Sequence, residues 1–100
     1  MIMNKEQISI ALKGFILEKF PLARKRGIHD ETFLLQSGIV DSLGILELVA
    51  FIENEFAMPV SDDELTPENF QNIAMMTSFV AGKAASDDVS NRKMEGVTKL

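Results

Sequence analysis

The sequence predicts an all-α fold, a small four-helix bundle made of three main helices, one short helix and a long first loop. Apolar residues recur at helical spacing in three separate stretches, and residues suited to helix capping precede them. No run of alternating apolar and polar residues indicates a strand. With 100 residues, 46% of them hydrophobic, the chain is sized for one core. We expect one helical domain over residues 1–85 and a polar, flexible tail over 86–100.

The first helix is predicted over residues 4–20. Asn4 can cap it with Gln7 as the capping-box partner, and Pro21 marks its end. The expected inward residues are Ile8, Ala11, Leu12, Phe15 and Ile16. Residues 21–41 then form a connection without a sustained period. A connection this long is expected to be anchored to the core, here by Phe33, Leu34, Ile39 and Val40. Its basic run, Arg24, Lys25 and Arg26, is interpreted as a solvated loop, with a docking patch as the minority alternative.

The second helix is predicted over residues 42–56, with Asp41 or Ser42 as its N-cap. One apolar stripe is assigned to the core and contains Ile45, Leu48, Val49, Ile52 and Phe56. A second apolar stripe contains Leu43, Leu46 and Ala50, and it is flanked by Glu47, Glu53 and Glu55. Two interpretations stay open. The helix is buried on most sides, or the second stripe is a docking face with an apolar centre and a charged rim.

Two further capping signals follow this helix. Glu64 lies three residues after Ser61, and Thr66 precedes Pro67, which suits the first position of a helix. We therefore expect a short helix over residues 67–72 and a last helix over 73–84. The residues of the last helix expected to face the core are Ile73, Met76, Phe79 and Val80.

The composition gives the chain little equipment for catalysis of its own. It has no cysteine and a single histidine, His29, and no calcium-loop pattern of carboxylates is present. We therefore expect no metal site and no catalytic residues. The net charge of −5 argues against binding to nucleic acid or anionic membranes. No stretch predicts a signal peptide or a span through a bilayer, so we expect a cytoplasmic protein without membrane insertion.

One stretch carries a family resemblance. Residues 38–43, GIVDSL, resemble the attachment motif of acyl carrier proteins. Residues 30–35, DETFLL, resemble the loop segment that precedes this motif, and residues 48–56 resemble the family's second helix. Residues 65–70, LTPENF, are similar to the third-helix segment of many bacterial carriers. The resemblance covers about residues 5–84. The string Asp-Ser-Leu alone would not be enough to indicate the family.

The resemblance implies a function. Ser42 would carry 4′-phosphopantetheine from coenzyme A, attached by a separate phosphopantetheinyl transferase. The thiol of this arm would carry acyl or aminoacyl intermediates as thioesters, for fatty-acid, lipid or specialised-metabolite biosynthesis. Asp41, also in the motif, would help to place a metal or cap the helix. The chain would not itself be an enzyme and would act as a monomer.

The resemblance also assigns a use to the second apolar stripe. Leu43, Leu46 and Ala50 would contact apolar partner surface, while Glu47, Glu53 and Glu55 would meet basic docking patches. The partners implied are the transferase and the acyl- or aminoacyl-loading and synthase enzymes. Acidic rims chiefly set encounter rate and partner choice. The resemblance further implies that the acyl chain slips between helices when it is loaded, and a core with six methionines and small alanines adapts easily.

The sequence departs from the family's pattern at Gly44, and two other functions are alternatives to the carrier role. Gly44 is a poor helix former that could loosen the first turn or make room close to the arm. The alternative function is a non-catalytic helical adaptor that binds a partner through the Leu43/Leu46/Ala50 face, with Ser42 as a cap only. A small hydrolase using Ser42 would need His29 as its base, and nothing in the sequence places the two together.

Overall fold

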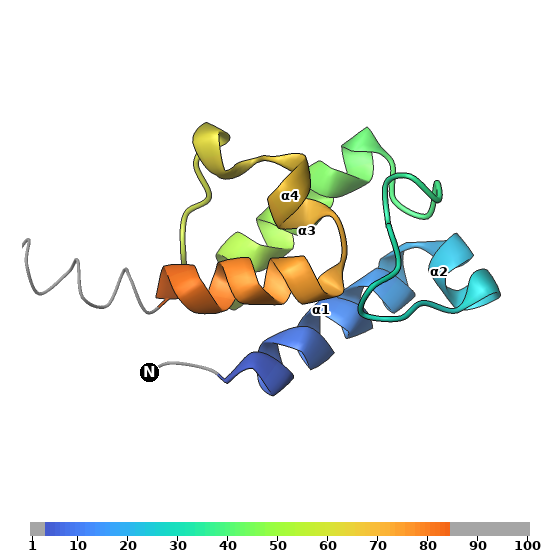
Figure 1. Cartoon of the computed structure of the whole chain (residues 1–100), viewed down its shortest axis with the longest axis horizontal. Coiled ribbons are helices and arrows are strands. Elements are labelled where there is room, and N and C mark those ends of the chain that lie inside the picture. Colours follow the sequence, from blue (N-terminus) through green and yellow to red (C-terminus); the bar gives the residue numbers. More distant parts are fainter. Residues whose placement is uncertain (1–3, 85–100) are drawn as a thin grey trace, which may run out of the picture.

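The computed structural model describes residues 4–84, and all of its regular elements are helical (Figure 1). In chain order these are α1 Lys5–Lys19, α2 Pro21–Arg26, α3 Ser42–Glu55, the 3-10 helix η1 Asp62–Glu64, α4 Pro67–Phe70, and a helix over residues 73–84. No strand occurs between residues 4 and 84, so the predicted all-α class is confirmed. The tail predicted over residues 86–100 lies outside the described residues.

The start of α1 has the predicted capping box. The Asn4 side chain accepts a hydrogen bond of 2.8 Å from the Gln7 backbone N–H, and the Gln7 side chain accepts one of 3.3 Å from the Asn4 N–H. Both bonds satisfy N–H groups that the helix itself cannot pair. Ile8, Leu12 and Ile16 form the buried stripe of α1, as expected.

The prediction that residues 21–41 lack regular structure is wrong at their start. Pro21 does end α1, but it also occupies the first position of α2, where its missing N–H costs nothing. Gly27 ends α2 with a φ of 77°, which a residue without a Cβ adopts readily. The basic run is exposed, as expected, yet Arg24 Nη1 donates to the carbonyl oxygens of Leu17 and Glu18 at 2.6 and 2.9 Å. This arginine therefore satisfies carbonyls at the end of α1.

The connection from Gly27 to Asp41 is anchored at three of the four predicted residues. Leu34, Ile39 and Val40 are buried, but Phe33 is 45% exposed, so its assignment to the core is wrong. The inward position is taken by the neighbouring Leu34, whose N–H donates to the Gln71 carbonyl at 3.0 Å. A second bond, from the Ala74 N–H to the Asp30 carbonyl at 2.9 Å, holds the connection against the start of the last helix.

The core lies between α1, α3 and the helix over 73–84, with η1 and α4 joining the last two (Figure 1). Phe15 of α1 stacks on Phe51 of α3 with ring centroids 4.4 Å apart. Leu48 and Ile52 of the predicted core stripe are fully buried, and Ile45, Val49 and Phe56 pack half-buried against them. In the last helix Ile73, Met76 and Val80 are buried, while Phe79 is half-buried. The short helix predicted over 67–72 ends earlier, at Phe70.

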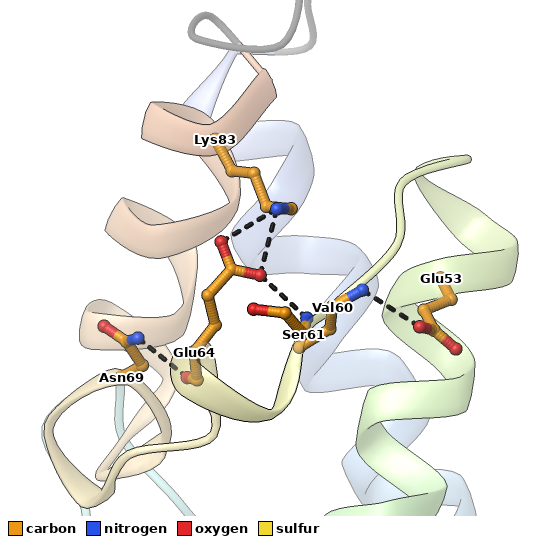
Figure 2. Close-up of polar contacts among 6 residues, drawn as sticks. All are labelled: Glu53, Val60, Ser61, Glu64, Asn69 and Lys83. Atoms are coloured by element: carbon orange, nitrogen blue, oxygen red, sulfur yellow. Dashed lines mark hydrogen bonds and ion pairs between the residues drawn. The ribbon is translucent and has the colours of Figure 1, made fainter.

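The segment between α3 and α4 is held by two glutamates (Figure 2). Glu53 accepts a hydrogen bond of 2.9 Å from the Val60 N–H. Glu64 accepts one of 2.9 Å from the Ser61 N–H, and Lys83 Nζ donates to both of its carboxylate oxygens at 2.9 and 2.8 Å. The hydrogen bond from Lys83, and then that from Ser61, lower the pKa of Glu64 below its ordinary value. Figure 2 shows that the contact between Glu64 and Lys83 joins η1 to the last helix.

Candidate functional site

Ser42 is the first residue of α3, and its side chain is exposed. The residue that caps the helix is Asp41, whose Oδ1 accepts a hydrogen bond of 2.7 Å from the Gly44 N–H. Within residues 4–84 the Ser42 hydroxyl makes no hydrogen bond. The choice between Asp41 and Ser42 as N-cap is therefore decided for Asp41, and the interpretation of Ser42 as a cap only is wrong.

The position of Ser42 favours a negative charge. The first N–H groups of a helix have no partner inside the helix, and the aligned peptide dipoles place a partial positive charge there. Asp41 pairs the Gly44 N–H, and the Ile45 N–H bonds to the Asp41 carbonyl at 3.0 Å. The N–H groups of Ser42 and Leu43 are the ones left for an anion attached to the serine.

Gly44 makes room for a neighbouring side chain. A Cβ at this position would lie 2.6 Å from Cε1 of Phe20 and 2.9 Å from Cγ1 of Val40. The Phe20 ring fills the place that a Cβ of residue 44 would take, and Gly44 also lines a pocket of about 380 Å³ together with Asp41 and Leu43. The first turn is not loosened in the structure, because Asp41 caps it and helix α3 is regular from Ser42 onward.

An apolar groove of about 220 Å³ opens beside Ser42, and we call it the Ser42 groove. Three segments of the chain build it: the connection before α3, the first turn of α3, and the segment from η1 to α4. Besides Ser42 its lining residues are Leu35, Ile45, Leu65, Thr66, Pro67 and Phe70. Sequence reasoning identified none of these as site residues except Ser42. The only signal was that Leu35 and residues 65–70 lie in the segments that carried the family resemblance.

The second apolar stripe of α3 is on the surface. Leu43 is 73% exposed and Leu46 is 57% exposed, and Ala50 is exposed beside them. The interpretation of α3 as buried on most sides is therefore wrong. Glu47 and Glu55 are exposed on the same helix, whereas Glu53, also exposed, has one carboxylate oxygen bonded to the Val60 N–H. Glu53 thus holds the fold in addition to carrying charge.

The lining of the Ser42 groove offers no general base, and the adjacent Asp41 carboxylate is engaged by the Gly44 N–H. None of the residues that line the Ser42 groove is titratable. His29 is exposed in the connection before α3, where its backbone N–H donates to Thr32 Oγ1 at 2.8 Å. A serine without a neighbouring base is a weak nucleophile, so the hydrolase alternative lacks its central requirement.

Within residues 4–84, no group of three or more histidines, aspartates or glutamates is arranged to hold a metal ion. None of the helices in that part of the chain has the length and apolar character needed to cross a membrane.

Comparisons with known proteins agree with the motif. No model of a known protein family matches the chain. An acyl carrier protein of Exiguobacterium sibiricum is 31% identical over 78 residues, which cover 78% of this chain and 95% of that protein. The chain belongs to the acyl carrier protein family.

Two further members of the acyl carrier protein family show the range of similar proteins. The probable acyl carrier protein PigG of a Serratia species is 32% identical over 69 residues, covering 69% of this chain and 79% of that protein. The aminoacyl carrier protein 2 of Bradyrhizobium diazoefficiens is 32% identical over 59 residues, covering 59% of this chain and 65% of that protein. The chain is thus equally identical, at 32%, to a relative named as an acyl carrier and to one named as an aminoacyl carrier.

Proposed function

We propose that this member of the acyl carrier protein family carries acyl or aminoacyl groups as thioesters on a 4′-phosphopantetheine arm attached to Ser42. The arm supplies the thiol that a chain without cysteine lacks. Ser42 provides the oxygen of the phosphodiester, and a separate phosphopantetheinyl transferase provides the base. The chain acts as a carrier between enzymes and not as a catalyst.

The observation that carries this proposal is the freedom of the Ser42 hydroxyl at a helix N-terminus. It is exposed, and within residues 4–84 it makes no hydrogen bond, because Asp41 has taken over capping. The adjacent N–H groups and the helix dipole favour the phosphodiester that would be attached there. The residues present therefore fit the group.

Partner enzymes are proposed to dock on the exposed face of α3 made by Leu43, Leu46, Glu47, Ala50 and Glu53. Exposed leucines bordered by carboxylates fit an apolar partner surface ringed by basic residues. A carrier must leave each enzyme after its visit, so a charged rim that speeds encounter suits it better than a large apolar interface.

Intact mass spectrometry tests the attachment. The purified chain is measured before and after incubation with coenzyme A, Mg²⁺ and a broad-specificity phosphopantetheinyl transferase. We expect a gain of one phosphopantetheine, or the same mass already present at the start. Ser42→Ala should show neither, whereas Ser78→Ala, at an exposed serine of the last helix, should behave as the unchanged chain.

A matched pair of variants tests the docking face in the same assay. Leu46→Asp and Ile10→Asp each place an acid at an exposed apolar residue, 57% and 65% exposed, on α3 and α1 respectively. Loss of a buried interface anchor costs about 1–2 kcal/mol, so the kcat/KM of the transferase should fall about tenfold for Leu46→Asp alone. Equal effects of both variants would remove the docking role of this face.

The adaptor alternative makes a different prediction. Its partner binding would use the same leucines and would survive Ser42→Ala unchanged. If the chain gains no mass with several transferases, the adaptor becomes the favoured function.

A further inference from the structure

The pocket of about 380 Å³ that Gly44 lines flanks Ser42 and shares no lining residue with the Ser42 groove. We call it the junction pocket, because the junction of α1 and α2 forms one side of it and α3 the other. Figure 1 shows α2 and the first turn of α3 at the same end of the molecule. Two of its lining residues, Leu43 and Glu47, also belong to the proposed docking face. A partner seated on that face therefore reaches the junction pocket.

The junction pocket has an apolar floor and a rim that carries charges of both signs. Phe20 and Ile39 line it and are buried. On the side of α3 the exposed charged groups are the carboxylates of Asp41 and Glu47. On the side of the junction the exposed charged group is the ammonium of Lys19. The sign of the surface charge thus changes from one side of the pocket to the other.

Positive charge continues from the junction pocket along α2. Residues 19–29 contain no carboxylate and four cations, namely Lys19, Arg24, Lys25 and Arg26, in a chain whose net charge is −5. Lys25 follows the pocket residues Pro21 and Leu22 by four and three positions, so it lies on the same face of the helix. The helical rise places it about 6 Å from Pro21 along the axis. The positive surface is therefore continuous with the pocket.

The positive charges are not neutralised within residues 4–84. Arg26 Nη1 donates to the Ser37 carbonyl at 2.7 Å, and Arg24 donates to carbonyls of α1. Carbonyl oxygens carry no net charge, so these bonds fix the two guanidinium groups in place and leave their charge available. Lys19 and Lys25 are exposed and make no ion pair within those residues. Charges that are already held in position lose less conformational entropy when a partner binds.

A protein matches this surface better than a membrane or a nucleic acid does. Phosphate groups present a single sign of charge, and the carboxylates of Asp41 and Glu47 on the same pocket would repel them. A protein segment can direct carboxylates toward α2 and cations toward α3. Charges of both signs, arranged in this way, fix the orientation of a bound partner.

We propose that Lys19, Leu22 and Lys25 form a second part of the docking surface, where a partner enzyme places an apolar side chain in the junction pocket and carboxylates against the two lysines. The inference rests on the proposed function, because the partner is an enzyme that acts on the group carried at Ser42. Cations of the same partner meet Glu47. A partner that carries only basic residues meets like charge at α2, so the surface selects partners with both signs.

Two short peptides serve as probes for such a partner segment. Each begins with two arginines and two leucines, after which the first peptide ends in two glutamates and the second in two further arginines. Each is titrated to millimolar concentration into the whole chain labelled with nitrogen-15, and backbone amide NMR signals are recorded. The first peptide should shift the signals of Leu22 and Lys25 together with those of Leu43 and Glu47. The second should shift those of Leu43 and Glu47 alone.

Lys25→Glu is the decisive variant, because it reverses an exposed charge that makes no hydrogen bond within residues 4–84. An exposed ion pair contributes up to about fivefold in affinity, and the reversal adds repulsion, so the first peptide should bind about fivefold more weakly. The second peptide should bind more tightly, and such opposite changes cannot result from unfolding. Lys25→Gln, which removes the charge without reversing it, should weaken the first peptide about twofold.

Lys5→Glu is the matched control. It makes the same charge change at another exposed helix lysine, about 21 Å from Lys19 along α1. Charges at that separation are screened at physiological ionic strength, so the affinity for either peptide should change by less than about 1.5-fold.

Three results would overturn the inference. With the mass gain at Ser42 intact, the proposed function would stand and the inference would fail if the first peptide left Leu22 and Lys25 unshifted, or if Lys25→Glu and Lys5→Glu weakened it equally. Binding to phosphatidylglycerol vesicles that Lys25→Glu abolishes would assign this face to an anionic membrane instead. Absence of any mass gain at Ser42 would refute the proposed function itself, and the inference with it.

Discussion

Replacing Gly44 by alanine tests whether the first turn of α3 depends on its contact with Phe20. Alanine in a helix interior is favoured over glycine by about 0.8–1.0 kcal/mol, so propensity alone predicts a more stable protein. The structure predicts the opposite. The added Cβ would approach Cε1 and Cζ of Phe20 to 2.6 and 3.0 Å and Cγ1 of Val40 to 2.9 Å.

The size of the effect follows from what would have to move. Phe20 is 8% exposed and Val40 is completely buried, so neither side chain can swing into solvent freely. The Phe20 ring also meets Phe15 edge to face, with centroids 6.3 Å apart. Overpacking of such sites costs about 1–3 kcal/mol, which exceeds the gain in propensity. We expect Gly44→Ala to lower the free energy of unfolding by about 1 kcal/mol.

Gly14 provides the matched control. It lies within α1, is exposed, and an added Cβ would meet nothing within 4 Å. Gly14→Ala should therefore raise the free energy of unfolding by about 0.5–1 kcal/mol. The two substitutions are chemically identical, so opposite signs would isolate the contact with Phe20 and Val40.

Urea unfolding of both variants measures these changes through the transition midpoint at constant slope. A double-mutant cycle with Phe20→Leu then tests the cause, because Gly44→Ala should cost at least about 0.5 kcal/mol less once the ring is gone. Stabilisation by Gly44→Ala equal to that by Gly14→Ala would refute the reasoning.

Two further predictions concern single polar contacts. Asp41→Ala should lower the free energy of unfolding by about 1 kcal/mol, as loss of an N-cap does, while Ser42→Ala should change it by less than about 0.5 kcal/mol in the same urea assay. Equal losses would contradict the assignment of the cap to Asp41. The second prediction concerns Glu64, whose pKa is lowered in the folded state by Lys83 and Ser61. A lowered pKa stabilises the fold above the ordinary glutamate value of about 4.3 and loses this contribution as pH falls through the folded value. As pH falls below the ordinary glutamate value of about 4.3, the unchanged chain should therefore lose stability more steeply than Lys83→Met. Lys25→Met, at an exposed lysine of α2, should keep the steeper profile. Parallel profiles for all three proteins would show that the contact between Glu64 and Lys83 adds nothing measurable.

The features that could be predicted from the sequence depend on residues close together in the chain. The capping boxes at Asn4 and Ser61 join residues three apart, and the apolar stripes of α1 and α3 follow from helical period alone. The position of Ser42 at a helix start was predictable for the same reason. α2 escaped prediction because proline both ends one helix and begins the next, and local pattern does not separate the two roles.

Only the tertiary structure decided which apolar side chains remain exposed to solvent. Leu46 and Leu48 are equally apolar, yet one is 57% exposed and the other completely buried, because neighbouring elements cover only part of the circumference of α3. The contact of Phe20 with Gly44 joins the junction of α1 and α2 to α3, and Glu64 meets Lys83 nineteen residues away. The Ser42 groove likewise needs three segments brought together by packing. The sequence thus determined where helices start and that Ser42, the proposed attachment residue, lies at such a start. The folded chain decided what surrounds that serine, since burial depends on neighbours that local sequence does not specify.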